Sequence, residues 1–209
     1  MSRGLGDVYK RQVDYSYLKT SSYSGMKSTC VDALAHMIES RLNTNANAFS
    51  RAYAEEGMKL WASCKGCLET EERFAQMTDD EFSTFMQASV LAGMAIAYTG
   101  TSIPHGLSYT LTYENGVPHG KAVGVFLSGF LKKYGDSTEV EYVVKQLLGF
   151  DDIDTFRDYI RTLFGKLDMS EKLWKKDRDG ILANPAKLKN YPFELTADML
   201  DDYVRYYNA

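Results

Sequence analysis

The chain has 209 residues, 44% hydrophobic and 25% charged, so it is long enough for one substantial hydrophobic core. A formal net charge of -4 argues against nucleic-acid and anionic-membrane surfaces, because both would repel an acidic protein. No apolar run reaches the roughly eighteen residues that span a bilayer. Three cysteines, an odd number, fit a reducing compartment. We therefore expect a cytoplasmic protein with a small-molecule partner, and neither a nucleic-acid nor a membrane partner.

The N-terminal residues do not resemble the start of a folded domain. The stretch that begins at Asp7, Asp-Val-Tyr-Lys-Arg-Gln, resembles a translated sequencing-library adapter. Residues 1–12 are therefore expected to be an artefact, with the true gene beginning further upstream. Residues 13–18 alternate weakly in hydrophobicity, which predicts an edge strand or a linker, and residues 21–27 predict a polar loop. We expect residues 13–27 to be the end of an interdomain linker.

A helical domain is predicted from residue 28 to residue 209. Apolar residues first recur at helical spacing at Val31, Leu34, Ala35, Ile38 and Leu42. Asp32 and His36 are four residues apart, so they project from one face of this predicted helix, with Glu39 one turn on. A carboxylate and an imidazole at this spacing can share a metal ion. The plainer alternatives are a capping box between Thr29 and Asp32, and an ordinary core histidine at position 36.

Two more helices are predicted before the other histidines. Residues 48–63 are amphipathic, and their buried side is expected to consist of Phe49, Tyr53, Met58, Leu60 and Trp61. Thr78 and Glu81 form a capping box that begins a helix running to about residue 98. The second half of that helix is apolar or small all round, which predicts burial on every side, and Gly100 ends it.

The remaining two histidines lie in Pro-His-Gly triplets, which centre on His105 and His119. Because proline is favoured in the first turn of a helix, each histidine is expected near a helix N-terminus, where the macrodipole disfavours the imidazolium form. Neutral imidazole is the form that binds metal ions. Gly106 and Gly120 remove side-chain bulk, so backbone or substrate can approach closely. Taken alone, each triplet is more often just a turn.

The C-terminal third is predicted to be helical as well. Helices are expected near residues 137–148 and 152–164, with glycines 135, 149 and 165 marking helix ends. Ser170 and Thr196 are suitable N-caps for two further helices. In the last of these, the apolar positions at helical spacing are Leu200, Tyr203, Val204 and Tyr207.

Three histidines and one carboxylate suggest one shared metal site. With neutral imidazoles and a divalent ion the site carries a net charge of about +1 and leaves room for a substrate. Ligand softness alone permits zinc, iron(II), cobalt or nickel. Each histidine by itself has an ordinary structural explanation, so the joint arrangement carries this interpretation.

The surroundings of these residues resemble the iron-containing alcohol dehydrogenases. The similarity covers Asp-Ala-Leu-x-His-x-Ile-Glu, the two Pro-His-Gly triplets, and the segments 45–50 and 92–95. In that family an Asp, the His four residues on and two later His hold the catalytic metal. The resemblance gives these roles to Asp32, His36, His105 and His119.

One position departs from the family pattern. Many members carry a further His four residues after the first triplet histidine, where this chain has Tyr109. The position lies near the substrate and nicotinamide in the family, so Tyr109 is expected at most to line the cleft wall. The tyrosine version resembles the 1,3-propanediol-dehydrogenase-like branch.

The resemblance implies an all-α, bundle-like C-terminal domain of the dehydroquinate synthase-like, iron alcohol dehydrogenase fold. The N-terminal α/β dinucleotide-binding domain is expected to be missing, and the chain shows no glycine-rich turn of the kind that holds a pyrophosphate. The implied cofactors are a divalent metal, Fe(II) first and Zn(II) second, and NAD or NADP in the full-length enzyme.

The implied reaction is oxidation of a small primary alcohol, or reduction of the aldehyde, by the full-length enzyme. The chain alone is expected to bind metal without turnover, and its exposed cleft face favours self-association and leaves room for a homodimer. Three alternatives stay open: a glycerol dehydrogenase-like enzyme, a dehydroquinate synthase-like enzyme, and a non-catalytic helical metal-binding module.

Overall fold

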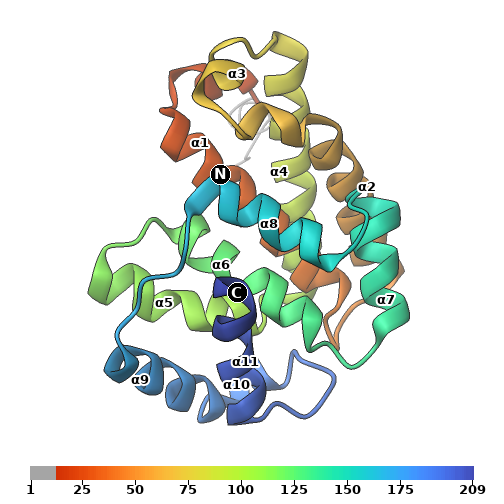
Figure 1. The fold of residues 1–209 in the computed structure, drawn as a ribbon. Coiled ribbons are helices and arrows are strands. Elements are labelled where there is room, and N and C mark those ends of the chain that lie inside the picture. The colour runs from red at the N-terminus through yellow and green to blue at the C-terminus, as the bar shows by residue number, and fades with distance from the viewer. Residues whose placement is uncertain (1–12) are drawn as a thin grey trace, which may run out of the picture.

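The computed structural model describes residues 13–209, and within that range it contains helices and no strand (Figure 1). The stretch 1–12, expected to be an artefact, lies outside the described residues. The all-helical expectation is confirmed. In chain order the elements are η3 (Tyr15–Thr20), α1 (Tyr23–Arg41), α2 (Ala48–Cys64), η4 (Lys65–Leu68), α3 (Glu71–Ala75), α4 (Asp79–Thr99), α5 (Ile103–Asn115), α6 (His119–Lys132), α7 (Ser137–Glu141), η5 (Tyr142–Leu147), α8 (Ile153–Phe164), α9 (Glu171–Leu182), α10 (Pro185–Leu188) and α11 (Ala197–Asn208).

Helix α1 lies at the centre of the molecule, between α2 and α4 on one side and α6 on the other (Figure 1). It is buried over most of its C-terminal half, which includes Val31, Leu34, Ala35, Met37 and Ile38. The indole N–H of Trp61 in α2 donates to the Cys30 carbonyl at 2.9 Å and joins the two helices. Because α1 is held from several sides, side chains on its remaining face have fixed positions.

Helix α6 packs closely against its neighbours because glycines lie at two crossing points. A Cβ added to Gly120 would lie 1.7 Å from the Ser28 carbonyl oxygen in α1, and one added to Gly129 would lie 2.5 Å from the Tyr203 Cα in α11. The Gly120 N–H also donates to the Ser28 hydroxyl at 3.1 Å. The start of α6, where His119 stands, is therefore held directly against α1.

The expectations for the first part of the chain are wrong in two places. Residues 15–20 form a 3-10 helix rather than an edge strand, because the Asp14 carboxylate accepts from the Ser16 N–H and closes the first turn. Helix α1 begins at Tyr23 inside the predicted polar loop, since the Ser22 hydroxyl caps it by accepting from the Gly25 N–H.

Helix α4 is buried along one stripe only, so the expectation of burial on every side is also wrong. It packs against α1 and α2 through Phe85, Ala88, Ala92 and Ala95. Its opposite face exposes Val90, Met94 and Tyr98. Phe49, expected in the core, is 66% exposed and stacks on Tyr98. Small residues on α4 serve close packing on one face and leave the other face free.

The predicted capping residues are largely confirmed. Thr78 and Glu81 form the capping box of α4, Gly100 ends that helix, and the hydroxyls of Ser170 and Thr196 cap α9 and α11. Gly149 and Gly165 have positive φ at the expected ends. The predicted helix 137–148 changes into a π-helix from Tyr142, and α6 ends before Gly135, at Lys132. None of the helices within residues 13–209 combines the length and hydropathy that crossing a membrane requires.

Replacing Gly120 by Ala should lower the free energy of unfolding by about 3 kcal/mol or more, because the new methyl group meets backbone rather than a flexible side chain. Urea unfolding measures the change. Gly93→Ala is the matched control: no heavy atom lies within 4 Å of its added Cβ, and it should stabilise α4 by about 0.5–1 kcal/mol. Equal effects of the two substitutions would contradict the close contact.

Asp177 is a buried carboxylate between α9 and α5. Its Oδ1 accepts from the Thr110 hydroxyl at 2.8 Å, whereas its Oδ2 has no hydrogen-bond partner among the described residues. Burial raises the pKa of Asp177 to about 7; the Thr110 bond opposes this rise and the Glu114 charge adds to it. The folded state therefore binds a proton that the unfolded chain releases at lower pH.

Stability should consequently fall as the pH rises from about 4 to above 7, since the charged form of Asp177 is disfavoured in the folded state. Asp177→Asn should remove much of this dependence and raise the midpoint of thermal unfolding at pH 8, with little effect at pH 5. Asp179→Asn, an exposed carboxylate on the same helix, is the control and should leave the slope unchanged. An unaltered slope in Asp177→Asn would show that another group is responsible.

Candidate metal centre

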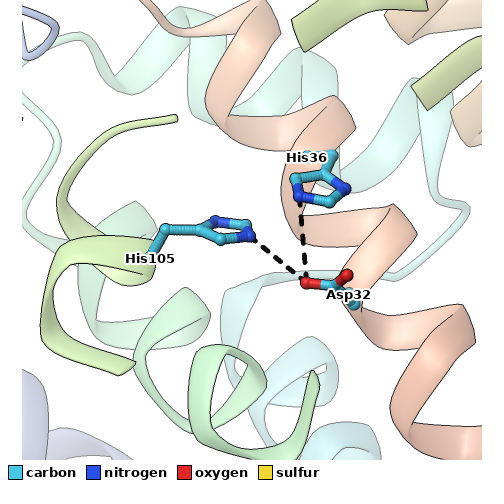
Figure 2. Close-up of side chains that lie close together, drawn as sticks. All are labelled: Asp32, His36 and His105. Carbon is cyan, nitrogen blue, oxygen red and sulfur yellow. Dashed lines mark hydrogen bonds and ion pairs between the residues drawn. The ribbon is translucent and has the colours of Figure 1, made fainter. Parts of the chain in front are cut away.

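Three helices bring the four predicted ligands together. Asp32 and His36 come from α1, His105 from the first turn of α5, and His119 from the start of α6. The Asp32 Oδ1 atom lies 3.2 Å from His105 Nε2, 3.5 Å from His119 Nε2 and 3.9 Å from His36 Nε2. Figure 2 shows His36 and His105 pointing toward this carboxylate. One potential ligand atom from each of four side chains therefore lies in a single small space.

The four side chains differ in how deeply they lie. Ligand atoms of Asp32, His36 and His105 all lie within 4.8 Å of one another, the one such group found among residues 13–209. The His36 and His105 rings stack with centroids 4.5 Å apart, while His119 meets His105 edge-on at 5.4 Å. The side chain of His105 is 3% exposed and that of His119 is 38% exposed. The group is therefore closed on the His105 side and open on the His119 side.

Glu39 holds the His105 ring in place on the side opposite to Asp32. This carboxylate is fully buried; its Oε2 accepts from the Ser102 N–H at 2.6 Å and its Oε1 from the His105 N–H at 2.9 Å. Oε1 also lies 3.0 Å from His105 Nδ1. Glu39 thus caps α5 and orients the ring so that Nε2 faces Asp32. A carboxylate on the second nitrogen of an imidazole is the arrangement that orients histidine ligands in metal sites.

The cap by Glu39 was not foreseen from sequence, which placed this residue only one turn beyond His36. The N-cap residue of α5, Ser102, makes no side-chain capping bond of its own. The first N–H groups of α5 are therefore satisfied by a carboxylate 63 residues away from Ser102. The available signal was the helical spacing of Asp32, His36 and Glu39, which places these three polar side chains along one side of α1.

The electrostatics of the site favour a positive charge at its centre. Burial opposes protonation of His105, but the Glu39 charge and the hydrogen bonds to Asp32 and Glu39 outweigh it and raise its pKa to about 10. The Glu39 carboxylate at this helix terminus therefore opposes the effect of the helix dipole on the pKa of His105. Burial and the His105 charge lower the pKa of His36. Two carboxylates, Glu39 and Asp32, thus face the two ring nitrogens of His105 and favour a positive charge there.

The two triplet glycines allow close approach, although by different neighbours. Gly120 admits the α1 backbone, as described above. A Cβ on Gly106 would lie 2.2 Å from Ile181 Cδ1 and 3.4 Å from Lys187 Cγ. Side chains of α9 and α10, rather than a substrate, therefore fill the space beside Gly106.

Tyr109 lies at the open side of the group. Its ring is parallel to that of His119, with an interplanar angle of 4° and centroids 6.3 Å apart, and it is half exposed. The Lys187 Nζ donates to the Tyr109 hydroxyl at 3.2 Å. Sequence reasoning missed Lys187, because its short helix lies 78 residues further along the chain and carries no motif.

Solved structures share this fold. An iron-containing alcohol dehydrogenase from Thermotoga maritima is 29% identical, with a TM-score of 0.81 over 93% of this chain and 52% of that chain. Sulfoacetaldehyde reductase from Bifidobacterium kashiwanohense, solved with NAD+, is 25% identical, with a TM-score of 0.76 over 94% of this chain and 53% of its own.

Two curated proteins that are similar to this chain in sequence are also dehydrogenases. 4-Hydroxybutyrate dehydrogenase of Clostridium kluyveri is 24% identical over 91% of this chain and 55% of its own length. The 1-propanol dehydrogenase PduQ of Citrobacter freundii is 31% identical over 48% of this chain and 26% of its own. The chain thus spans about half the length, or less, of these curated relatives.

The family model for the C-terminal part of the Fe-containing alcohol dehydrogenases matches residues 26–179, which include all four clustered side chains. That match covers well over half of the chain. The chain therefore belongs to the iron-containing alcohol dehydrogenase family, and it corresponds to the C-terminal, helical part of that family.

Proposed function

We propose that this chain is the metal-binding part of an iron-dependent alcohol dehydrogenase. In this proposal Asp32, His36, His105 and His119 hold one divalent ion, Fe(II) first and Zn(II) as the alternative. The observation that carries the proposal is the convergence of three imidazole Nε2 atoms within 3.2–3.9 Å of one carboxylate oxygen. Imidazole and carboxylate ligands suit both ions.

The charges around the site support a divalent ion. Asp32 and the buried Glu39 carry two negative charges in full, because the surrounding groups hold the pKa of each carboxyl below its ordinary value despite burial. One divalent ion would balance both charges and would displace the proton from His105. Glu39 would then keep the imidazole Nδ1–H as its donor and leave Nε2 free as a ligand.

The open side of the site fits a small substrate. A bound divalent ion would supply Lewis-acid chemistry toward an alcohol or aldehyde oxygen. His119 and Tyr109 are the exposed residues here, so they would form the wall along which a short primary alcohol or its aldehyde lies. Two relatives are named for oxidising 1-propanol and 4-hydroxybutyrate, which supports such substrates. The sulfoacetaldehyde reductase solved with NAD+ supports NAD, or NADP, as the hydride carrier.

We further propose a cytoplasmic location. All three cysteines are buried thiols, and none of them forms a disulfide within residues 13–209. Free buried thiols are typical of proteins from reducing compartments.

The metal-site proposal predicts one equivalent of divalent ion per chain. Loss of any one ligand in Asp32→Asn, His36→Ala, His105→Ala or His119→Ala should weaken binding severely, because a four-ligand site loses a quarter of its donors. Metal content after anaerobic loading with Fe(II) or Zn(II) measures this. Asp168→Asn, an exposed carboxylate between α8 and α9, should retain the full equivalent.

The complete gene product should then oxidise short primary alcohols with NAD or NADP when iron is bound, and should lose this turnover in each ligand variant. Full metal retention in both His105→Ala and His119→Ala would refute the shared site. Bound metal without turnover on any alcohol or aldehyde would instead favour a non-catalytic metal-binding module.

Glu39→Gln should lower metal affinity by about 10–100-fold, the usual effect of losing a carboxylate behind a histidine ligand. The amide also places an N–H donor against a backbone N–H of α5, so the free energy of unfolding should fall too. Competition against a coloured chelator gives the affinity, and circular dichroism checks that the variant is folded. Unchanged affinity in folded Glu39→Gln would contradict a role in orienting His105.

A further inference from the structure

Lys187 carries a positive charge that no acidic side chain in residues 13–209 neutralises. Its Nζ donates to two neutral hydroxyls, those of Thr101 and Tyr109, and lies 5.2 Å from the centroid of the Tyr109 ring. Within the described residues its polar contacts are thus with hydroxyl groups and not with a carboxylate. By contrast, the neighbouring Lys176 on α9 pairs with Glu114.

The position of Lys187 is fixed rather than incidental. Its Cγ lies beside Gly106, where an added Cβ would be only 3.4 Å away. Asn190, just beyond α10, is 7% exposed and donates through its side chain to the Thr101 carbonyl at 2.8 Å. The Asn190 carbonyl in turn accepts from the Thr44 N–H at 3.2 Å. These bonds hold the segment of Lys187 against the residues that lead into α5.

The ammonium group stands at the open side of the metal centre. It contacts the Tyr109 hydroxyl, and the Tyr109 ring lies parallel to that of His119. Tyr109 is one helical turn beyond His105, and Thr101 precedes Ser102, whose N–H is bound by Glu39. Tyr109 is thus a neighbour of both Lys187 and His119, and the side chains of Tyr109 and His119 are the exposed ones here.

The charges of the proposed site indicate what Lys187 would bind. The carboxylates of Asp32 and Glu39 match the two charges of a divalent ion, so the ammonium group of Lys187, next to Tyr109, has no compensating charge. A half-buried cation held by hydroxyls alone keeps a donor free for a charged acceptor, and a charge-assisted hydrogen bond is stronger than a neutral one.

We propose that Lys187, with the Thr101 and Tyr109 hydroxyls, binds the anionic end of the substrate. This inference rests on the proposed function and narrows its substrate class to short alcohols, or aldehydes, that carry a carboxylate at the other end. The reacting oxygen would lie among Asp32 and the three histidines, while the carboxylate would lie against the ammonium group. Lys187 is then a specificity-determining residue and takes no part in hydride transfer.

The test compares short ω-hydroxycarboxylates with diols of the same carbon number in the iron-loaded complete gene product. The parent should prefer the carboxylates. Lys187→Met should raise KM for the carboxylates by about 10-fold or more, with kcat and the diol KM little changed. Lys187→Arg should retain most of the preference, and Lys189→Met, which removes the same charge two residues away, should retain all of it.

A binding measurement separates recognition from catalysis. In the zinc-loaded 209-residue chain, calorimetric titration with the same carboxylates should show binding that Lys187→Met weakens and Lys189→Met does not, with metal content equal in all variants. Turnover of diols without any carboxylate preference in the parent would overturn the role of Lys187 and leave the proposed function standing. If the parent neither binds metal nor turns over any alcohol or aldehyde, both the proposed function and the role of Lys187 are refuted. A Lys187→Met variant that loses carboxylates and diols equally would show a structural role only.

Discussion

The bond between Glu39 and the start of α5 is the interaction on which the site depends. A fully buried carboxylate would be costly alone, yet Glu39 accepts from two backbone N–H groups and faces an imidazole nitrogen. It thereby satisfies the N–H groups at the start of a helix that has no side-chain cap at Ser102. The same carboxylate orients the ring of His105. Glu39 therefore fixes both the packing of α5 on α1 and the position of His105 in the candidate metal centre.

The second constraint is the contact between α6 and α1. His119 can approach Asp32 because Gly120 lets the first turn of α6 lie against the Ser28 carbonyl. Any side chain at that position would move the helix outward and the imidazole with it. Packing and chemistry are therefore coupled here: α1 supplies two of the clustered side chains and is also the surface against which the other two are positioned.

The clustered side chains differ in burial, so the site has a closed side and an open side. His105 is enclosed by Glu39 and His36, whereas His119 and Tyr109 face outward. Enclosed side chains are held rigidly, whereas exposed ones are accessible to a small molecule. Lys187 adds a positive charge next to Tyr109 on the open side, where the proposed anionic end of a substrate would lie.

Helical periodicity, capping boxes and Pro-His-Gly triplets are local patterns, so they were sufficient to predict the helical class, the N-caps of α4, α9 and α11, and the four clustered side chains. The sequence did not predict burial where burial depends on neighbouring helices: the second half of α4 is apolar or small all round, yet only its face against α1 and α2 is covered. The cap by Glu39, the raised pKa of His105 and the place of Lys187 follow from the tertiary structure alone. Each depends on contacts between residues more than sixty positions apart, whose electrostatics no local pattern encodes.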